Sequence, residues 1–475
     1  MKQLVLLGIA AAAAAMAATP TFNHDIAPIL YQNCATCHRP GEVAPFSLLT
    51  YQDAAKRAKQ LAAVTHSRFM PPWKAEPGYG SFLNERRLTD AQIALIADWA
   101  ANGAPEGDAA EKPTPPKFTD GWQAGQPDKV FTLEQKYSLP ADGPDQYRCF
   151  VIPMNLDHDV YVKSFEFRPD NRRIVHHAIV FSDPNGAARR LAGDRGSYTC
   201  FGGPGFGPVN MVAGWAPGGS PNAAPKGMEI EVAKGSDLVL QIHYHPSGKA
   251  EEDQSSLGMI FGDAPTVGRG MVFINSRAIH IPAGDAHYVV TTGITIPQDV
   301  EALAITPHAH YLCKDMKVDA HLPDGSVTHL IWIKDWDFNW QGQYRFAQPV
   351  KLPKGTRVEL EYTYDNSAAN VRNPSHPPVA VHWGEQTTDE MAVAFLSVKL
   401  DSMADQERFR RQIGLEFINE FLAQADDLND FPPEINPQAR ARLKMAISLF
   451  DRNHDGKLDA DERKTLMDFL RARAQ

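Results

Sequence analysis

The chain has 475 residues, of which 43% are hydrophobic and 22% charged, and its formal net charge is −10. This composition is typical of globular proteins and excludes collagen, a mainly disordered chain and a bundle of membrane helices. Lysine and arginine form no long run, so we expect no nucleic-acid partner, since sequence-independent binding requires clustered cations. The length suggests about three domains.

The first 18 residues have the pattern of a secretory signal peptide. Lys2 supplies the positive charge, residues 4–15 form an apolar run, and Ala15-Met16-Ala17 fits the small-residue cleavage site. A membrane anchor is the alternative, but the run is shorter than the ~20 residues that span a bilayer. We expect a periplasmic or secreted protein without a membrane span, in a compartment where disulfides persist.

Residues 19–107 are rich in alanine and predict a small all-α domain that ends after the capping box Thr89-Asp90-Ala91-Gln92. Within it, Cys34-Ala35-Thr36-Cys37-His38 has the C-x-x-C-H spacing of a c-type haem site, where two thiols bond the vinyl groups and the imidazole binds iron. A redox dithiol would need a βαβ context, and a zinc site a second Cys/His pair, and the sequence has neither. We predict a cytochrome c domain that holds haem c through Cys34, Cys37 and His38.

Two residues can supply the second axial ligand of this haem. Met70 is the first choice, because a thioether is the usual partner of histidine and raises the potential, although Met70 can also be a core side chain. His66 is the alternative ligand and would give a lower potential. Residues 108–118, rich in proline, alanine and charge, predict a linker.

From 119 to 400 the sequence changes to short β-type runs separated by Gly, Pro and Asp, such as 160–167, 174–181 and 237–245. This pattern is typical of antiparallel β-sandwiches. The length suits two of them, which we place at 119–270 and 271–400.

Three groups of histidines lie in this β region. His308 and His310 alternate, so on a strand both imidazoles point to one face and can reach one metal ion. His176 and His177 are adjacent and can share a metal only at a bulge or bend. His243, in the run Gln-Ile-His-Tyr, is the third group. A single histidine is more simply a satisfied polar residue, but three groups favour a metal. Imidazole and thioether ligands favour copper or zinc, and a thioether favours copper.

The motifs follow one another as His-His, Gln-x-His-Tyr, His-x-His and then a methionine, Met391, in an acidic-then-apolar strand. This order, over about 130–400, resembles the copper- and ascorbate-dependent monooxygenases, the family of dopamine beta-monooxygenase and peptidylglycine alpha-hydroxylating monooxygenase. The resemblance implies two jelly-roll-like sandwiches and hydroxylation of an unactivated C–H bond of a small organic substrate with O2.

By this resemblance the chain binds two copper ions. The electron-transfer copper, on the first sandwich, would have three histidine ligands: His176, His177 and His243. The copper at which O2 is used, on the second sandwich, would have two histidines and a thioether: His308, His310 and Met391. Gln241 falls on a matched position near the first copper, and we count it with the second ligand set among the catalytic residues.

Related enzymes also carry a disulfide that brackets the His-His pair, which implies Cys149–Cys200 here. Cys313 is then left as a buried small hydrophobe or an adventitious copper ligand. The peptide-amidating enzymes have an arginine and a tyrosine where this chain has Thr306 and Phe395, so a peptide C-terminus is not the expected substrate. The fused haem domain suggests a source of electrons within the chain. It would replace or supplement an external donor, which is ascorbate or a redox protein.

Residues 401–475 predict a helical tail that contains one EF-hand, because 451–462 matches the twelve-residue calcium loop. Five side chains and one backbone carbonyl would bind Ca²⁺: Asp451, Asn453, Asp455, Lys457 (carbonyl), Asp459 and Glu462. The sequence contains no second loop, which favours a structural clamp over a sensor. A chance acidic loop is the alternative.

Two other function classes remain. A non-catalytic periplasmic haem and copper protein, for electron transfer or copper binding, would use the same sites but would not need Met391 or an open pocket. An extracellular adhesion or carbohydrate-binding sandwich is disfavoured by the redox motifs.

Overall fold

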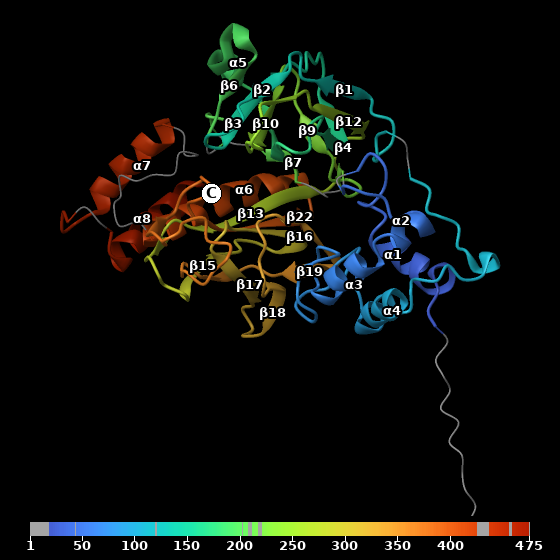
Figure 1. Cartoon of the computed structure of the whole chain (residues 1–475). Coiled ribbons are helices and arrows are strands. Elements are labelled where there is room, and N and C mark those ends of the chain that lie inside the picture. Colours follow the sequence, from blue (N-terminus) through green and yellow to red (C-terminus); the bar gives the residue numbers. More distant parts are fainter. Residues whose placement is uncertain are drawn as a thin grey trace, which may run out of the picture. The chain divides into compact units, whose positions relative to one another are not determined.

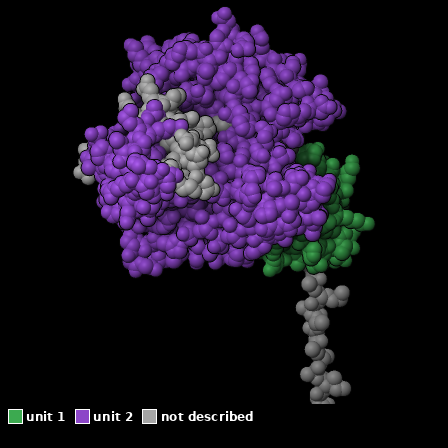
Figure 2. All heavy atoms as spheres, turned by 90° about the vertical axis from the view of Figure 1, so that its left-hand side faces the viewer, with its two compact units in different colours: residues 1–73, 86–117 green, residues 74–85, 118–475 purple. Residues whose placement is uncertain are grey.

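The computed structural model describes residues 19–42, 44–118, 121–201, 203–207, 211–216, 221–424, 437–455 and 458–474. The predicted signal peptide, 1–18, lies outside these residues. Two compact units make up the chain (Figure 2), one of Met1–Trp73 and Arg86–Lys117, the other of Lys74–Glu85 and Phe118–Gln475. Most of the described structure is antiparallel β-sheet accompanied by helices, which confirms the predicted β class. No helix among these residues has the length and apolarity needed to cross a bilayer.

The first unit contains helices in its described part. These are η1 (Phe22–Ile26), α1 (Ala27–Asn33), α2 (Tyr51–Ala55), α3 (Ala58–His66), α4 (Asp90–Ala101) and η2 (Ala109–Glu111). Their apolar faces form one core around the fully buried Ile96 and Trp99. Thr89 and Gln92 form the predicted capping box at the start of α4, where each side chain accepts from the other's backbone N–H. That this unit is a cytochrome c domain stays a prediction.

Two sheets of the second unit form a first sandwich (Figure 1). One has the order β1-β12-β4-β8, with β9 also paired to β4, and the bounds are β1 (Lys129–Thr132), β4 (Val160–Arg168), β8 (Asn222–Ala223), β9 (Ile230–Val232) and β12 (Ser256–Gly262). The other has the order β6-β3-β10-β5-β7, with β3 (Gln146–Ile152), β5 (Val175–Asp183), β6 (Ser197–Thr199), β7 (Met211–Trp215) and β10 (Asp237–Tyr244). Phe165 of the first sheet and Leu240 of the second belong to one buried core.

Shorter elements border this sandwich. They are the paired strands β2 (Tyr137–Leu139) and β11 (Glu251–Asp253), the helix α5 (Ala187–Ala192) and the turn η3 (Gly193–Arg195). The central strand β10 is buried along its whole length, and its polar residues Asp237, Gln241 and His243 each have a hydrogen-bond partner.

A second sandwich follows. Its sheets have the orders β13-β22-β16-β19 and β15-β20-β17-β18. The bounds are β13 (Gly268–Ser276), β15 (Tyr288–Thr295), β16 (Val300–His308), β17 (Cys313–His321), β18 (Val327–Ile333), β19 (Tyr344–Leu352), β20 (Arg357–Tyr364) and β22 (Ala392–Leu400), with the short pair β14 (His280–Ile281) and β21 (Val381–His382) beside them. Tyr362 of β20 donates its hydroxyl to the carbonyl of Val393 in β22, so the sheets face each other across a buried layer.

The C-terminal helices are α6 (Met403–Gln424), α7 (Pro437–Phe450) and α8 (Ala460–Ala474). α6 lies against β13, where Phe409 is buried and a Cβ at Gly270 would meet its ring at 2.8 Å, so only glycine allows this approach. Leu422 of α6 packs with Leu466 and Met467 of α8 in a separate small core.

Residues 74–85, which we call the strap, leave the predicted N-terminal domain and join the second unit. The strap forms isolated β-bridges from Ala75 to Ile333 and from Phe82 to Phe346. The Phe82 ring stacks on Phe346 with centroids 5.5 Å apart. The strap is therefore held on β18 and β19 by both backbone pairing and aromatic contact.

Candidate metal centres

The first histidine set, His176, His177 and His243, lies on the neighbouring strands β5 and β10. His177 is directly opposite His243, but the next pair is Val175 with Tyr244, so the register slips by one residue at His176. This irregularity brings His176 and His177 close together. From the sequence, such a bulge or bend was the condition under which the two could share a metal.

The three Nδ1 atoms of the first histidine set converge. His176 and His243 bring theirs within 3.1 Å, and both other pairs are 3.3 Å apart. Ligand nitrogens at the usual ~2.0 Å from one tetrahedral ion would be separated by about 3.3 Å. The donor set therefore fits a first-row transition ion with no movement of the side chains.

A carboxylate, Asp145, fixes one ring of this set. It accepts from His243 Nε2 at 2.9 Å and from His245 Nδ1 at 2.7 Å. Because Nε2 of His243 carries the proton, its Nδ1 keeps a lone pair for a metal. Burial alone would raise the pKa of Asp145, but the two hydrogen bonds, with the charges of both imidazoles, hold it well below its usual range.

The surroundings also favour the neutral form of His176 and His177, which is the form that binds metals. Burial, together with the charge of His243, lowers the pKa of His176 to about 3, and burial lowers the pKa of His177 well below its usual value. The ring of Tyr147 stacks on His243 with centroids 4.2 Å apart. These contacts leave little freedom for the rings to turn away.

Gln241 is buried two residues before His243 on β10. Its amide nitrogen donates to the carbonyls of Cys200 and Gly203, at 3.2 and 3.3 Å. Cys200 is joined to Cys149 of β3 by a disulfide, the pairing that the family resemblance implies. Gln241 thus connects β10 to the disulfide loop, and its predicted catalytic role stays a prediction.

The second histidine set, His308 and His310, is built differently. β16 ends at His308, and His310 follows in the loop, yet the ring centroids are only 5.2 Å apart. His308 Nδ1 contacts Gln341 Oε1 at 2.6 Å, and His310 Nδ1 contacts the carbonyl of Asp389 at 3.0 Å. Both contacts need a proton on Nδ1, so each ring keeps its lone pair on Nε2, the atom that could then bind a metal. Burial lowers the pKa of each, to about 3 for His310.

One buried carboxylate joins this set to Met391. Oε2 of Glu390 accepts from the backbone N–H groups of His310 and Met391, at 2.9 and 3.1 Å, and Oε1 accepts from that of Leu312 at 2.5 Å. The β16–β22 register, in which His308 is opposite Val393, carries His310 to the level of Met391 two residues further on. Burial raises the pKa of Glu390 to about 8, against the effect of its backbone donors.

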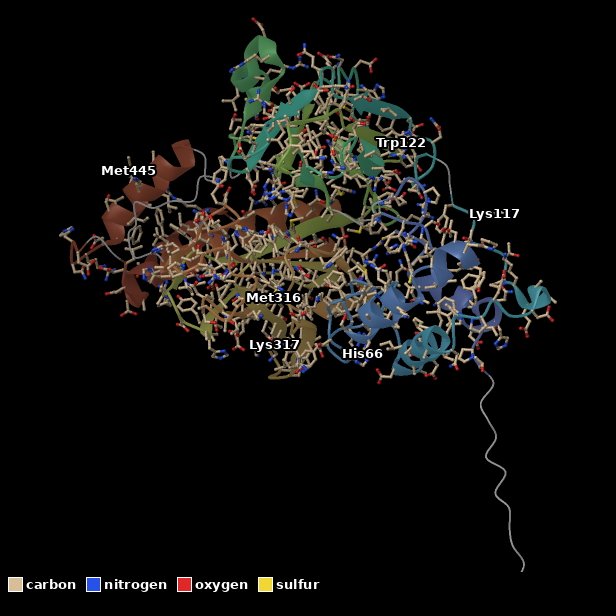
Figure 3. All side chains as sticks on the ribbon, in the orientation of Figure 1. His66, Lys117, Trp122, Met316, Lys317 and Met445 are labelled. Atoms are coloured by element: carbon tan, nitrogen blue, oxygen red, sulfur yellow. A yellow bond between two sulfur atoms is a disulfide. The ribbon has the colours of Figure 1, made fainter. Side chains whose placement is uncertain are left out.

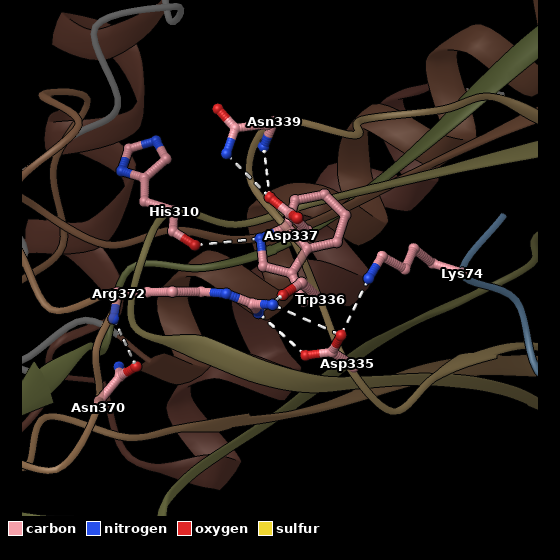
Figure 4. Close-up of polar contacts among 8 residues, drawn as sticks. All are labelled: Lys74, His310, Asp335, Trp336, Asp337, Asn339, Asn370 and Arg372. Carbon is pink, nitrogen blue, oxygen red and sulfur yellow. Dashed lines mark hydrogen bonds and ion pairs between the residues drawn. The ribbon is translucent and has the colours of Figure 1, made fainter. Parts of the chain in front are cut away.

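An aromatic side chain, Phe338, contacts both histidine sets. Its ring stacks on His176 with centroids 4.9 Å apart and meets His310 nearly edge-on at 5.6 Å. The neighbouring Trp336 donates its indole N–H to the carbonyl of His310 at 3.1 Å (Figure 4). Asp335 accepts from Lys74 of the strap at 2.9 Å, and from Arg372. The strap is therefore bonded to Asp335, and the next residue, Trp336, is bonded to His310.

The predicted haem attachment sequence lies at the end of α1, where Cys34 follows the last helical residue. Cys34 and Cys37 are not disulfide-bonded, and burial raises the pKa of the Cys34 thiol to about 12. His38 Nδ1 contacts the carbonyl of Phe46 at 3.1 Å, so Nε2 carries the free lone pair, and burial lowers the pKa of this imidazole. This tautomer, with both thiols outside any disulfide, fits covalent haem c.

The two alternatives for the second axial ligand differ in exposure. Met70 is half-buried and its N–H donates to the carbonyl of Val64 at 3.0 Å. His66, labelled in Figure 3, is exposed at the end of α3. An axial ligand must lie in a water-poor haem pocket, so this difference favours Met70.

The predicted calcium loop joins α7 to α8. Glu462 accepts from the N–H groups of Arg452 and Asp459, at 2.7 and 3.1 Å, which closes the loop on itself. Asp451 and Glu462, at its first and last positions, are buried carboxylates. Lys457 lies outside the described residues. Asn453, Asp455 and Asp459 hydrogen-bond within the loop.

Several of these residues were absent from the sequence prediction, namely Asp145, Gln341, Glu390, Trp336 and Phe338. Only Glu390 had a visible signal, as the acidic residue that directly precedes Met391. The others are brought to the histidines by strand pairing and loops that leave no short motif.

Comparison with known proteins identifies no family. No family model and no curated protein matches the chain. Among solved structures, the VP2 subviral particle of infectious bursal disease virus matches with 9% identity over 58% of this chain and 72% of its own, at a TM-score of 0.16. The T13 particle of that virus matches with 8% identity over 74% of this chain and 92% of its own, at a TM-score of 0.17. The CBM22 tandem domain of Paenibacillus barcinonensis Xyn10C matches with 8% identity over 56% of this chain and 82% of its own, at a TM-score of 0.12. Such TM-scores carry no argument about fold or function.

Proposed function

We propose that this chain is an exported monooxygenase of the copper- and ascorbate-dependent family, which hydroxylates an unactivated C–H bond of a small organic substrate. The observation that carries the proposal is the convergence of the three Nδ1 atoms of the first histidine set, at tetrahedral spacing, beside a second set that presents Nε2 atoms. One oxygen atom of O2 enters the C–H bond and the other leaves as water, which consumes two electrons and two protons.

Copper, when bound, supplies one-electron redox chemistry and the activation of O2. The chain's own residues hold and orient its ligands. Asp145 keeps the proton of His243 on Nε2, and Gln341 and the carbonyl of Asp389 keep those of His308 and His310 on Nδ1. Glu390 holds the backbone of His310 and Met391 together. A thioether from Met391 would favour Cu(I), the state that meets O2, whereas three imidazoles tolerate both redox states.

Haem c is proposed as the electron source within the chain, with ascorbate or a redox protein as the external donor. Cys34, Cys37 and His38 would hold it, and the free Nε2 of His38 supports this assignment. In stopped-flow mixing, chemically reduced haem should be reoxidised as copper is reduced, within one turnover time. Haem that stays reduced for many turnovers would eliminate it as the donor.

Calcium is proposed at the loop 451–462, where a bound ion would tie α7 to α8. Calorimetry should detect one Ca²⁺ per chain in the wild type, and a Glu462→Gln variant should bind far more weakly because its bidentate ligand is lost. A wild type without calcium affinity up to millimolar concentrations would leave the loop as an ordinary acidic turn.

The catalytic proposal is tested with reduced, copper-loaded protein under O2, offered amines, phenylalkyl compounds and peptides. Wild type should consume O2 and yield a hydroxylated product, whereas Met391→Ala should yield none. Met445→Ala is the matched control, since Met445 is an exposed methionine of α7 (Figure 3). Slow O2 uptake that Met391→Ala leaves unchanged would contradict catalysis and favour a non-catalytic electron-transfer or copper-binding protein.

A further inference from the structure

The second unit carries another close pair of imidazoles, His280 and His382, which belong to neither histidine set. The two residues are directly opposite each other on the antiparallel strands β14 and β21. Their Nδ1 atoms are 3.0 Å apart and their ring centroids 4.3 Å apart. This Nδ1-to-Nδ1 contact is the geometry that marks the first histidine set.

The backbone, rather than a chance rotamer, imposes this closeness. Residues directly opposite on an antiparallel pair point to the same face, with Cβ atoms ~5 Å apart. The neighbours Ile281 and Val381 are buried, so alternation directs His280 and His382 outward, and both are exposed. The carbonyl of His382 also accepts from the N–H of Glu390 at 3.1 Å, which ties the end of β21 to a buried segment.

Each ring lacks another polar partner. Within the described part of the chain, each imidazole makes one side-chain hydrogen bond, and that is to the other. When both rings carry their protons on Nε2, two lone pairs face each other at 3.0 Å, which is unfavourable unless a cation lies between them. At the first and second histidine sets, Asp145 and Gln341 accept the proton of a ring nitrogen and so fix which nitrogen keeps its lone pair. Water can accept that proton from His280 and His382 because both are exposed.

We propose that His280 and His382 form a surface site for a divalent first-row transition ion, with Cu²⁺ bound most tightly. Two nitrogens 3.0 Å apart, each ~2.0 Å from an ion, subtend an angle of about 97° at it. That angle suits two adjacent positions of tetragonal Cu²⁺, and the order of affinities places Cu²⁺ above Ni²⁺ and Zn²⁺ at nitrogen sites. Water completes the coordination. The proposal does not depend on the proposed function.

The test is a titration of the copper-loaded full chain with additional Cu²⁺, followed by electron paramagnetic resonance. Wild type should take up one further Cu²⁺ per chain, with superhyperfine splitting from two nitrogens. His280→Asn and His382→Asn should each abolish that ion and leave the interior copper content unchanged. His321→Asn, at an exposed histidine of β17, should behave as wild type.

Two outcomes would overturn the site. One is an equal number of bound ions in wild type and in the His280→Asn/His382→Asn double variant. The other is a two-nitrogen signal that survives both single variants, because the ligands would then be other residues. Retained interior copper and an unchanged melting temperature show that a variant is folded, so loss of the surface ion alone is specific to the pair. A chain without monooxygenase activity would leave this result unaffected.

Discussion

The two interior histidine sets reach a similar result by different means. The first has all its ligand atoms on two paired strands, where a register slip at His176 brings three Nδ1 atoms within 3.3 Å. The second has His308 at a strand end and His310 in a loop, each held by a separate acceptor. A preformed set needs little rearrangement between redox states, which suits electron transfer. The second set is assembled from a strand end and a loop, so the proposed third ligand, Met391, would have to come from the residue before β22.

The largest expected effect concerns the support of the first set. The Cys149–Cys200 disulfide joins residues that are 51 positions apart, and the loop it closes includes β5 with His176 and His177. Replacing both cysteines with serine should lower the free energy of unfolding by about 4 kcal/mol, because the unfolded chain gains loop entropy. Guanidinium unfolding of the wild type and the double variant measures this. A reduction below about 1 kcal/mol would mean that the strands alone hold the set.

Glu390 is the corresponding support of the second set. Glu390→Ala would leave three backbone N–H groups, two of them buried, without an acceptor and should cost about 3 kcal/mol of unfolding free energy, with loss of copper from the second set only. Glu361→Ala, at an exposed glutamate of β20, is the control and should change stability by less than about 0.5 kcal/mol. Equal copper loss from both sets would contradict the distinction between them.

Asp145 offers a smaller perturbation of the first set. Asp145→Asn should weaken its copper affinity by about 10–100-fold, because the orienting acceptor of His243 is lost, and should leave the second set unchanged. Competition titration with a Cu(I) chelator measures both affinities. Asp142→Asn, an exposed position in the same loop, should have no effect. An unchanged affinity in Asp145→Asn would show that the strands orient His243 without it.

The smallest effect is expected where the strap meets Asp335. Burial alone would raise the pKa of this carboxyl, but the hydrogen bonds and charges of Lys74 and Arg372 lower it overall. Because the folded-state pKa is below the unfolded value, these contacts stabilise the strap above about pH 4 and are lost as the pH falls through the folded pKa. The carboxylate is largely exposed, so each contact is worth only about 0.2–1 kcal/mol.

Amide exchange can detect this loss. The N–H groups of Glu76 and Leu83 donate to the carbonyls of Trp332 and Arg345, and their protection factors should fall on acidification. In Asp335→Asn the protection should already be lower and should no longer change across that pH range. Identical pH profiles in wild type and variant would remove Asp335 from the attachment of the strap.

The sequence predicted the strands better than the residues that hydrogen-bond the histidines. The runs 160–167 and 237–245 correspond to β4 and β10, because apolar, β-branched stretches bounded by turn residues are local signals. Asp145 is 98 residues from His243, and Glu390 is 80 from His310, so their contacts depend on strand pairing that local patterns do not encode. The strap was assigned to the helical domain for the same reason, since its partners Ile333 and Phe346 are about 260 residues away.

The central claim is that a thioether completes the second histidine set with copper. X-ray absorption at the copper edge of the Cu(I)-loaded protein tests it directly, because sulfur scatters more strongly than nitrogen. We predict one sulfur per two coppers in the wild type and in Cys313→Ser, and none in Met391→Leu. A wild type with nitrogen ligands alone, or a sulfur contribution that persists in Met391→Leu, would contradict the account.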